Sequence, residues 1–270
     1  MLTYPRPGHN NVDIVSRLYP RWRSQQVPLA DIVAALAAAE LEYLEECQRS
    51  NYGYTTRVPK PQGLTSKGMT HLYDAHLRDG HGREYYDDVL EDLNGVYKLC
   101  CYCGVRPGDT ADHYKEKATF PLLAVFPGNL VPSCPSCNTK LRSVADKFHG
   151  YYDSLKDVRW MQAHLIWDGS HNPPGIRYEV ITSFSSDDAL VGRVLTTFER
   201  AQLSKAWSSM VASMVVLAHR HFEVEGDYFE RVAFVEDLRF AHANHPEGPF
   251  QEAINAMLQS RWLTEFSSRS

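Results

Sequence analysis

Two C-x-x-C pairs have the residue type and the spacing of metal ligands. Cys100 and Cys103 form the first pair, and Cys134 and Cys137 form the second. A C-x-x-C turn directs two thiolates toward one ion, so two such turns complete a tetrahedral zinc site, and a reducing compartment disfavours disulfides. Because the protein would supply all four ligands, the expected Zn²⁺ is structural. The alternatives are a redox-active pair or cysteines that only fill the core, and the neighbouring Cys101 is expected to be a bystander.

Polar residues suited to catalysis lie between these cysteines and just after them. Asp112 and His113 are adjacent, Asn129 follows, and Asn138 comes directly after the last cysteine. Taken singly, each has an ordinary interpretation. An Asp-His pair is common in a surface turn, Asn129 suits a turn, and Asn138 suits the cap of a helix.

Local signals predict the secondary structure that carries these residues. The apolar stretch NLVPSC (129–134) indicates a short strand, and Pro135 suits the first turn of a helix. The expected order is therefore a strand with Asp-His, a long loop, a second strand, and a helix that carries Asn138.

The cysteines and the polar residues together resemble the HNH endonuclease family, in the ββα-metal (His-Me finger) fold with four zinc-binding cysteines. The phrase that carries the resemblance is CYCG…DHY…NLVPSCPSCN.K, over residues 101–140. The resemblance implies an α+β fold class with a zinc-stapled nuclease core, which we place at residues 96–150.

The resemblance also implies a role for each polar residue. His113 would be the general base, and Asp112 and Asn138 would be ligands of a catalytic divalent metal ion. Asn138 stands where many members have histidine, and Asn129 would brace the loop that carries the base. The family often has proline three residues after the base, whereas this chain has Glu116.

Phosphodiester hydrolysis explains why these residue types would be needed. Histidine titrates near neutrality and can take a proton from water. Mg²⁺ or Mn²⁺ prefers oxygen ligands, and an ion with only two protein ligands keeps positions for phosphate and water. Four basic residues are expected to contact the nucleic-acid backbone without reading bases: Lys115, Lys117, Lys140 and Arg142.

Periodicity and capping residues predict the flanks. We expect a helical region over 1–95, a β-hairpin extension over 151–195 and a helical region over 196–270, either separate or packed as one compact unit. The individual elements expected are a helix over 28–44, a loop over 55–68, a helix over 84–97 that ends at Gly95, a hairpin of 161–168 with 176–182, a helix capped by Thr196 and Glu199, a helix capped by Asp227 and Glu230, and a helix that begins at Pro249.

Composition limits the classes of function. Hydrophobic residues make up 43% of the 270 residues and charged residues 23%, which is ordinary for a soluble protein. The net charge of −5 argues against a protein that coats nucleic acid by bulk electrostatics. We see no secretory signal, and the most apolar stretch (210–218) is too short to cross a bilayer, so a cytoplasmic protein without a membrane partner is expected.

The sequence therefore predicts a metal-dependent HNH endonuclease that hydrolyses nucleic acid, with DNA favoured over RNA and double-stranded DNA as partner. The resemblance adds restriction or phage-defence systems as a setting. It also suggests a protein partner for targeting or activation, an ATPase among the candidates. The alternative is a catalytically silent zinc-binding module that docks nucleic acid or a protein.

Overall fold

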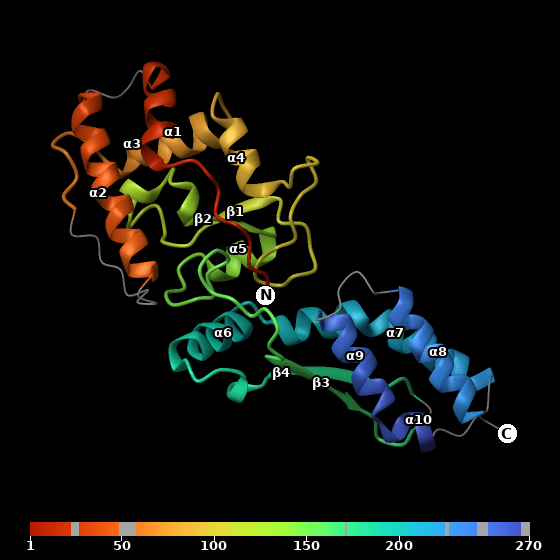
Figure 1. The fold of residues 1–270 in the computed structure, drawn as a ribbon. Helices are drawn as coiled ribbons and strands as arrows, with labels where there is room; N and C mark the ends of the chain where they lie inside the picture. The colour runs from red at the N-terminus through yellow and green to blue at the C-terminus, as the bar shows by residue number, and fades with distance from the viewer. Residues whose placement is uncertain (23–26, 49–57, 171, 225–226, 242–247, 266–270) are drawn as a thin grey trace. The chain divides into compact units, whose positions relative to one another are not determined.

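Two compact units make up the structure, a computed structural model that describes residues 1–22, 27–48, 58–170, 172–224, 227–241 and 248–265 (Figure 1). The first unit comprises Met1–Lys156 and Asp187–Ala201, and the second comprises Asp157–Ser186 and Gln202–Ser270. The fold is mixed α+β and mostly helical, with two small antiparallel sheets of two strands each. The expected N-terminal region and core thus share one unit, while the expected hairpin belongs with the C-terminal helices.

Helices enclose the hydrophobic core of the first unit. They are α1 (Asn11–Leu18), α2 (Leu29–Gln48), α3 (Ser66–His71), the π-helix η2 (Leu72–Arg78), α4 (Arg83–Leu90), α5 (Pro135–Leu141) and α6 (Asp188–Arg200). The helix predicted over 28–44 is confirmed as α2, and it buries Ile32 and Leu36 on one face, as its 3.6-residue periodicity requires.

The predicted helix over 84–97 is too long. α4 ends at Leu90, and Gly95, expected to end the helix, has a φ of 71° in a tight turn instead. The Asp92 carboxylate accepts hydrogen bonds from the backbone N–H of Asn94 and of Val96, at 2.8 and 3.1 Å. This side chain offers the backbone a turn in place of the helix, which is why the helical pattern stops early.

A hairpin followed by a helix lies at the centre of the first unit, as predicted. β1 (Thr110–His113) pairs antiparallel with β2 (Leu130–Ser133), and His113 lies opposite Leu130. The long connection contains two short 3-10 helices, η3 (Pro121–Leu123) and η4 (Pro127–Asn129). α5 begins at Pro135 directly after β2 and packs on β1.

The second unit is a hairpin covered by helices. β3 (Met161–Ile166) pairs antiparallel with β4 (Gly175–Val180), which confirms the predicted hairpin. α7 (Leu203–Val224) packs on β4, and α9 (Pro249–Leu258) packs on β3 (Figure 1). The remaining helices are α8 (Tyr228–Ala241), where Asp227 caps as expected, and α10 (Arg261–Glu265).

Two element boundaries differ from the prediction. Thr196 and Glu199 do not cap a helix, because they lie inside α6; Asp187 begins that helix by accepting hydrogen bonds from two backbone N–H groups. Gln202, with a φ of 56°, separates α6 from α7. The expected loop over 55–68 ends earlier, since α3 begins at Ser66, and residues 55–57 lie outside the described part.

No helix among the described residues is both long enough and apolar enough to cross a membrane.

Candidate functional site

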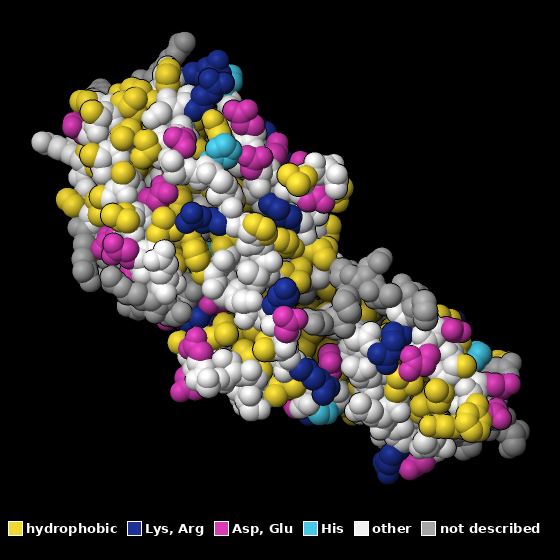
Figure 2. Space-filling view, viewed as in Figure 1, with side chains coloured by type: hydrophobic (Ala, Val, Ile, Leu, Met, Phe, Trp, Pro, Cys, Tyr) yellow, Lys and Arg dark blue, Asp and Glu magenta, His cyan; other side chains and the backbone are white. Residues whose placement is uncertain are grey.

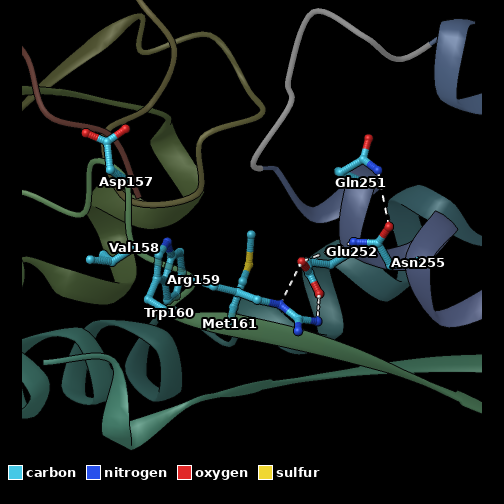
Figure 3. Close-up of a pocket in the computed structure, with 8 residues that line it drawn as sticks. All are labelled: Asp157, Val158, Arg159, Trp160, Met161, Gln251, Glu252 and Asn255. Carbon is cyan, nitrogen blue, oxygen red and sulfur yellow. Dashed lines mark hydrogen bonds and ion pairs between the residues drawn. The ribbon is translucent and has the colours of Figure 1, made fainter.

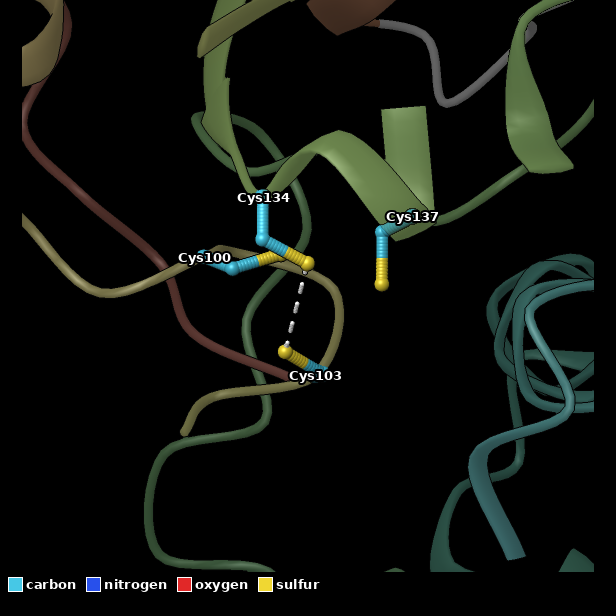
Figure 4. Close-up of side chains that lie close together, drawn as sticks. All are labelled: Cys100, Cys103, Cys134 and Cys137. Atoms are coloured by element: carbon cyan, nitrogen blue, oxygen red, sulfur yellow. Dashed lines mark hydrogen bonds between the residues drawn. The ribbon is translucent and has the colours of Figure 1, made fainter. Parts of the chain in front are cut away.

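The four predicted cysteines converge (Figure 4). Their sulfur atoms all lie within 4.8 Å of one another, and all four residues are buried. The Sγ atoms of Cys103 and Cys134 are 4.0 Å apart. Four thiolates bound to zinc at about 2.3 Å in a tetrahedron would have sulfur atoms about 3.8 Å apart, so the cluster fits a structural Zn²⁺.

Two backbone turns present these cysteines. The Cys100 N–H donates to Arg106 O at 2.7 Å, and the Gly104 N–H donates back to Cys100 O at 2.8 Å. Gly104 has a φ of 70°, which glycine adopts without strain. The second pair lies at the start of α5, where Cys134 is the N-cap and the Asn138 N–H donates to Cys134 O at 2.9 Å. One helical turn therefore positions both zinc ligands and Asn138.

Cys101 lies outside the four-thiol cluster. Its backbone N–H donates to Pro132 O at 2.9 Å, which joins the first cysteine turn to β2. Its side chain is fully buried beside Gly150, where an added Cβ would lie 3.0 Å from the Cβ of Cys101. The structure thus gives Cys101 a packing role.

A cavity of about 320 Å³ lies beside the hairpin and brings the predicted polar residues together. Asp112 and His113 of β1 line it, and so does Asn138 of α5. Asn129 does not line it. We call this space the hairpin cavity.

Asp112 is held by a buried network. It is 1% exposed, and its Oδ2 accepts hydrogen bonds from Tyr102 Oη at 2.6 Å and from Lys147 Nζ at 2.7 Å. Lys147 is itself fully buried. Within the described part of the chain, Oδ1 accepts no hydrogen bond, so this oxygen is available to a cation in the hairpin cavity.

Asn138 offers a second oxygen. Its Nδ2 donates to Thr110 Oγ1 at 3.1 Å and to Ala111 O at 3.4 Å. These two acceptors fix the orientation of the amide, because only the nitrogen can donate. The Oδ1 atom has no partner among the described residues. An amide oxygen and a carboxylate oxygen suit a hard divalent cation such as Mg²⁺ or Mn²⁺.

A hydrogen bond to the backbone fixes the tautomer of His113. Its Nε2 lies 2.8 Å from Ala124 O. Because a carbonyl only accepts, Nε2 carries the hydrogen and Nδ1 carries the lone pair of the neutral ring. Burial is the main cause that lowers the pKa of His113 to about 3, so the ring is neutral at pH 7.

Asn129 connects the two ends of the loop that follows β1. Its Oδ1 accepts from the Lys115 N–H at 2.7 Å, and its Nδ2 donates to Lys115 O at 2.9 Å and to Leu123 O at 3.1 Å. Leu123 precedes Ala124, the residue whose carbonyl accepts from His113. This fully buried amide therefore lies one residue from the group that orients the imidazole.

The four predicted phosphate contacts lie in different places. Lys117 and Arg142 line the hairpin cavity together with Glu116. Lys140 is exposed, but it donates to Ala201 O at 3.0 Å instead of lining the cavity. Lys115 does not line the hairpin cavity; this residue is 8% exposed and its Nζ lies over the rings of nearby aromatic residues, and its contact with nucleic acid stays a prediction.

Several cavity residues were missed in the sequence. Tyr73 and Arg78 line the hairpin cavity from η2. Lys147 does not line it, but its Nζ donates to Oδ2 of Asp112, which does. Arg78 stands in HLRDG and Lys147 in VADKF, and neither stretch has a motif that would single it out.

A second cavity, of about 450 Å³, lies in the second unit (Figure 3). Arg159 donates there to Glu252 through Nε at 3.3 Å and Nη2 at 2.9 Å, and Gln251 donates to Asn255. None of the residues predicted to carry chemistry lines this cavity. Among the described residues that line it, Arg159 is the one cationic side chain, and it is paired with Glu252.

Comparison with known proteins identifies a relative in a bacteriophage. Over 131 residues, the chain is 32% identical to protein ea31 of Escherichia phage lambda, a stretch that covers 43% of this chain and 42% of protein ea31. The chain is a distant homologue of protein ea31 across less than half the length of that protein. No protein-family model matches the chain, and no solved structure matches it.

Proposed function

We propose that the first unit is a metal-dependent HNH endonuclease of the ββα-metal type that hydrolyses phosphodiester bonds in DNA. One observation supports this most strongly. The hairpin cavity is lined by an imidazole with its Nδ1 lone pair available and by two residues with an unpaired oxygen, Asp112 and Asn138. A zinc ribbon that only holds its own fold has no use for this combination.

His113 would accept the proton of an attacking water at Nδ1, because its Nε2–H is bonded to Ala124 O. Asp112 and Asn138 would hold a divalent cation through their free oxygens. When bound, that ion would polarise the phosphate and stabilise charge on the leaving oxygen. Lys117 and Arg142 would hold the phosphate at the cavity.

The zinc ion would stabilise the fold and take no part in the reaction. Its four thiolates would join the first cysteine turn to the start of α5, which carries Asn138, and would leave no position for water. Removal of the zinc would therefore displace one proposed ligand of the catalytic ion.

A catalytically silent zinc-binding module is the second candidate, and the buried Lys147 is the observation that favours it. Its ammonium group already neutralises Asp112 at 2.7 Å, which weakens the attraction of the carboxylate for a divalent cation. Such a module would bind nucleic acid without cutting it.

Cleavage of supercoiled plasmid distinguishes these candidates. With zinc-loaded protein in excess over plasmid, Mg²⁺ or Mn²⁺ is expected to produce nicked or linear DNA, and omission of the divalent ion is expected to stop it. D112N and N138A should need higher concentrations of the divalent ion or lose activity, because D112N removes the negative charge of one ligand and N138A removes the oxygen of the other. Plasmid that is bound but uncut in either ion would favour the silent module.

Delivery by a protein partner is part of the proposal. The chain carries a net charge of −5, and the hairpin cavity supplies only a few cations for phosphate. A nuclease that binds DNA weakly would depend on a partner that brings it to its target. The resemblance to HNH proteins suggests a restriction or phage-defence system, with an ATPase as the candidate partner.

A further inference from the structure

A π-helix brings residues of the N-terminal region to the hairpin cavity. η2 (Leu72–Arg78) continues α3, and its Tyr73 and Arg78 line the same cavity as His113. π-helical turns are rare and occur frequently at functional sites. This helix lies outside residues 101–140, which carry the family resemblance, so the resemblance assigns it no role.

Tyr73 separates the imidazole from two cations. The residue is 3% exposed, and the centroid of its ring lies 4.4 Å from that of His113. Lys117 Nζ lies 4.3 Å from the Tyr73 centroid, and the guanidinium carbon of Arg78 lies 6.0 Å from it. The ring contacts both the base and the cations and so fixes their spacing.

One carboxylate oxygen holds both cations. Asp74 Oδ1 accepts from Arg78 Nη1 at 3.0 Å and from Lys117 Nζ at 2.9 Å. Arg78 also contacts Asp79 through Nε and Nη2, at 3.0 and 2.7 Å. The Asp79 side chain is 57% exposed, and exposed ion pairs contribute little stability, so a phosphate can replace this partner.

Arg78 carries the type of side chain that binds phosphate through two atoms, and a phosphate would replace Asp79 at its Nε and Nη2. Its side chain is 41% exposed and lines the hairpin cavity, where Lys117 and Arg142 are the other cations and Glu116 brings the opposite charge. A guanidinium presents a planar fork that binds two phosphate oxygens at once, which a lysine cannot do.

We propose that Arg78 binds the scissile phosphate and stabilises the charge that develops on it during cleavage. Asp74 is the positioning residue that holds Arg78 and Lys117 at the cavity. This inference rests on the proposed nuclease function. It makes the N-terminal helical region a part of the active site, which would be incomplete with the zinc-stapled hairpin alone.

Single-turnover and steady-state cleavage of plasmid by full-length variants test the proposal. R78A is expected to lower kcat on the order of a hundredfold, with a much smaller change in KM, because a preorganised donor to the developing charge is lost. R78K should fall between R78A and the parent, since it restores the charge without the fork. D74N should lower kcat less than R78A does, and D74E should restore part of the loss.

A partly exposed ion pair in the second unit provides the control. Arg239 and Glu236 on α8 have an i, i+3 spacing, with Arg239 Nε 2.8 Å from Glu236 Oε2 and an Arg239 side chain that is 34% exposed. Neither residue lines the hairpin cavity. R239A and E236Q should keep the kcat of the parent.

The outcomes separate this inference from the proposed function. Parent-like kcat in R78A, with H113A inactive, would overturn the role of Arg78 and leave the nuclease proposal standing. Equal losses in R78A and R239A would also overturn it, because they would indicate a general effect of surface charge. Parent-like cleavage by H113A would overturn the nuclease proposal itself. Where R78A does not fold, a lowered kcat in folded R78K supports the role of Arg78, and a parent-like kcat overturns it.

Discussion

At the scale of single residues, the buried pair of Asp112 and Lys147 decides whether the site can accept a cation. Lys147 is fully buried, and its Nζ also donates to Leu141 O at 2.9 Å. The pair orients the carboxylate when no cation is bound, and it occupies Oδ2 while Oδ1 is left to a ligand. Preorganisation and weakened attraction for metal therefore arise from the same contact.

The Lys147→Met substitution measures this pair. Removal of one partner leaves a buried carboxylate without its counter-charge, which is expected to lower the free energy of unfolding by about 3–5 kcal/mol. The double variant D112N/K147M should recover much of that loss. Urea denaturation of zinc-loaded protein measures both, with K140M as control, because Lys140 is exposed. A loss in K147M no larger than that in K140M would contradict the account.

The cysteines allow a second test at this scale. C137S should lower zinc content from about one ion per chain and should destabilise the first unit, because ligand binding and local folding are coupled. C101S should keep the zinc, since the Cys101 sulfur lies outside the cluster. Elemental analysis of both purified variants provides the readout. Equal zinc content in the two would show that the cluster does not bind the ion.

Sequence spacing predicted some of these residues and not others, for a physical reason. Each cysteine pair lies on one short turn, and Asn138 shares the turn of the second pair, so their spacing alone indicates that they can face one point. Lys147 and Arg78 reach the site from segments outside the motif. The sequence around a single basic residue does not predict which groups its side chain will contact. The burial of Lys115 could not be predicted for the same reason: a charge near His113 in the sequence says nothing of burial, and Lys115 is 8% exposed.

At the scale of elements, local hydrogen-bonding side chains decided the boundaries. The hairpin and α5 were predictable because Pro135 and an apolar stretch are strong short-range signals. The end of α4 was not, because Asp92 accepts hydrogen bonds from backbone N–H groups that a longer helix would use. The start of α6 was not, because Asp187 caps this helix well before Thr196. Sequence pattern gives the existence of these helices more securely than their ends.

Comparison of Asp187→Ala with Thr196→Ala tests the corrected start of α6. Asp187 accepts from the backbone N–H groups of Ala189 and Leu190, at 3.0 and 3.2 Å, so its loss should cost about 1 kcal/mol of unfolding free energy. Thr196 lies inside the helix, where alanine has the higher helix propensity, so T196A should cost little. Denaturation midpoints of the two variants give the comparison. A larger loss of unfolding free energy in T196A than in D187A would contradict this start and support the capping box of Thr196 and Glu199.

At the scale of the whole molecule, charge limits how DNA can bind. Acidic side chains gather over α4 on the face shown in Figure 2, and this helix carries Glu84, Asp87 and Asp88. The net charge of −5 adds to the repulsion between the protein and nucleic acid. The proposed phosphate contacts are then confined to the hairpin cavity.

Binding to duplex DNA should accordingly show a shallow salt dependence. Three contacts, from Arg78, Lys117 and Arg142, predict a slope of log K against log salt of about −3, since each neutralised phosphate contributes about −0.9. Fluorescence anisotropy with the H113A variant measures this without cleavage, and a candidate partner protein should raise the affinity. Tight, sequence-specific binding by the isolated chain at physiological salt would indicate a recognition surface elsewhere.

The rate of plasmid cleavage by His113→Ala tests the nuclease proposal most directly. The substitution removes the base, and zinc content should stay close to that of the parent because the zinc ligands are untouched. With Mg²⁺ or Mn²⁺ and enzyme in excess, the account predicts a single-turnover rate on the order of a hundred- to ten-thousandfold below that of the parent. A folded, zinc-loaded H113A protein that cuts as fast as the parent would contradict it.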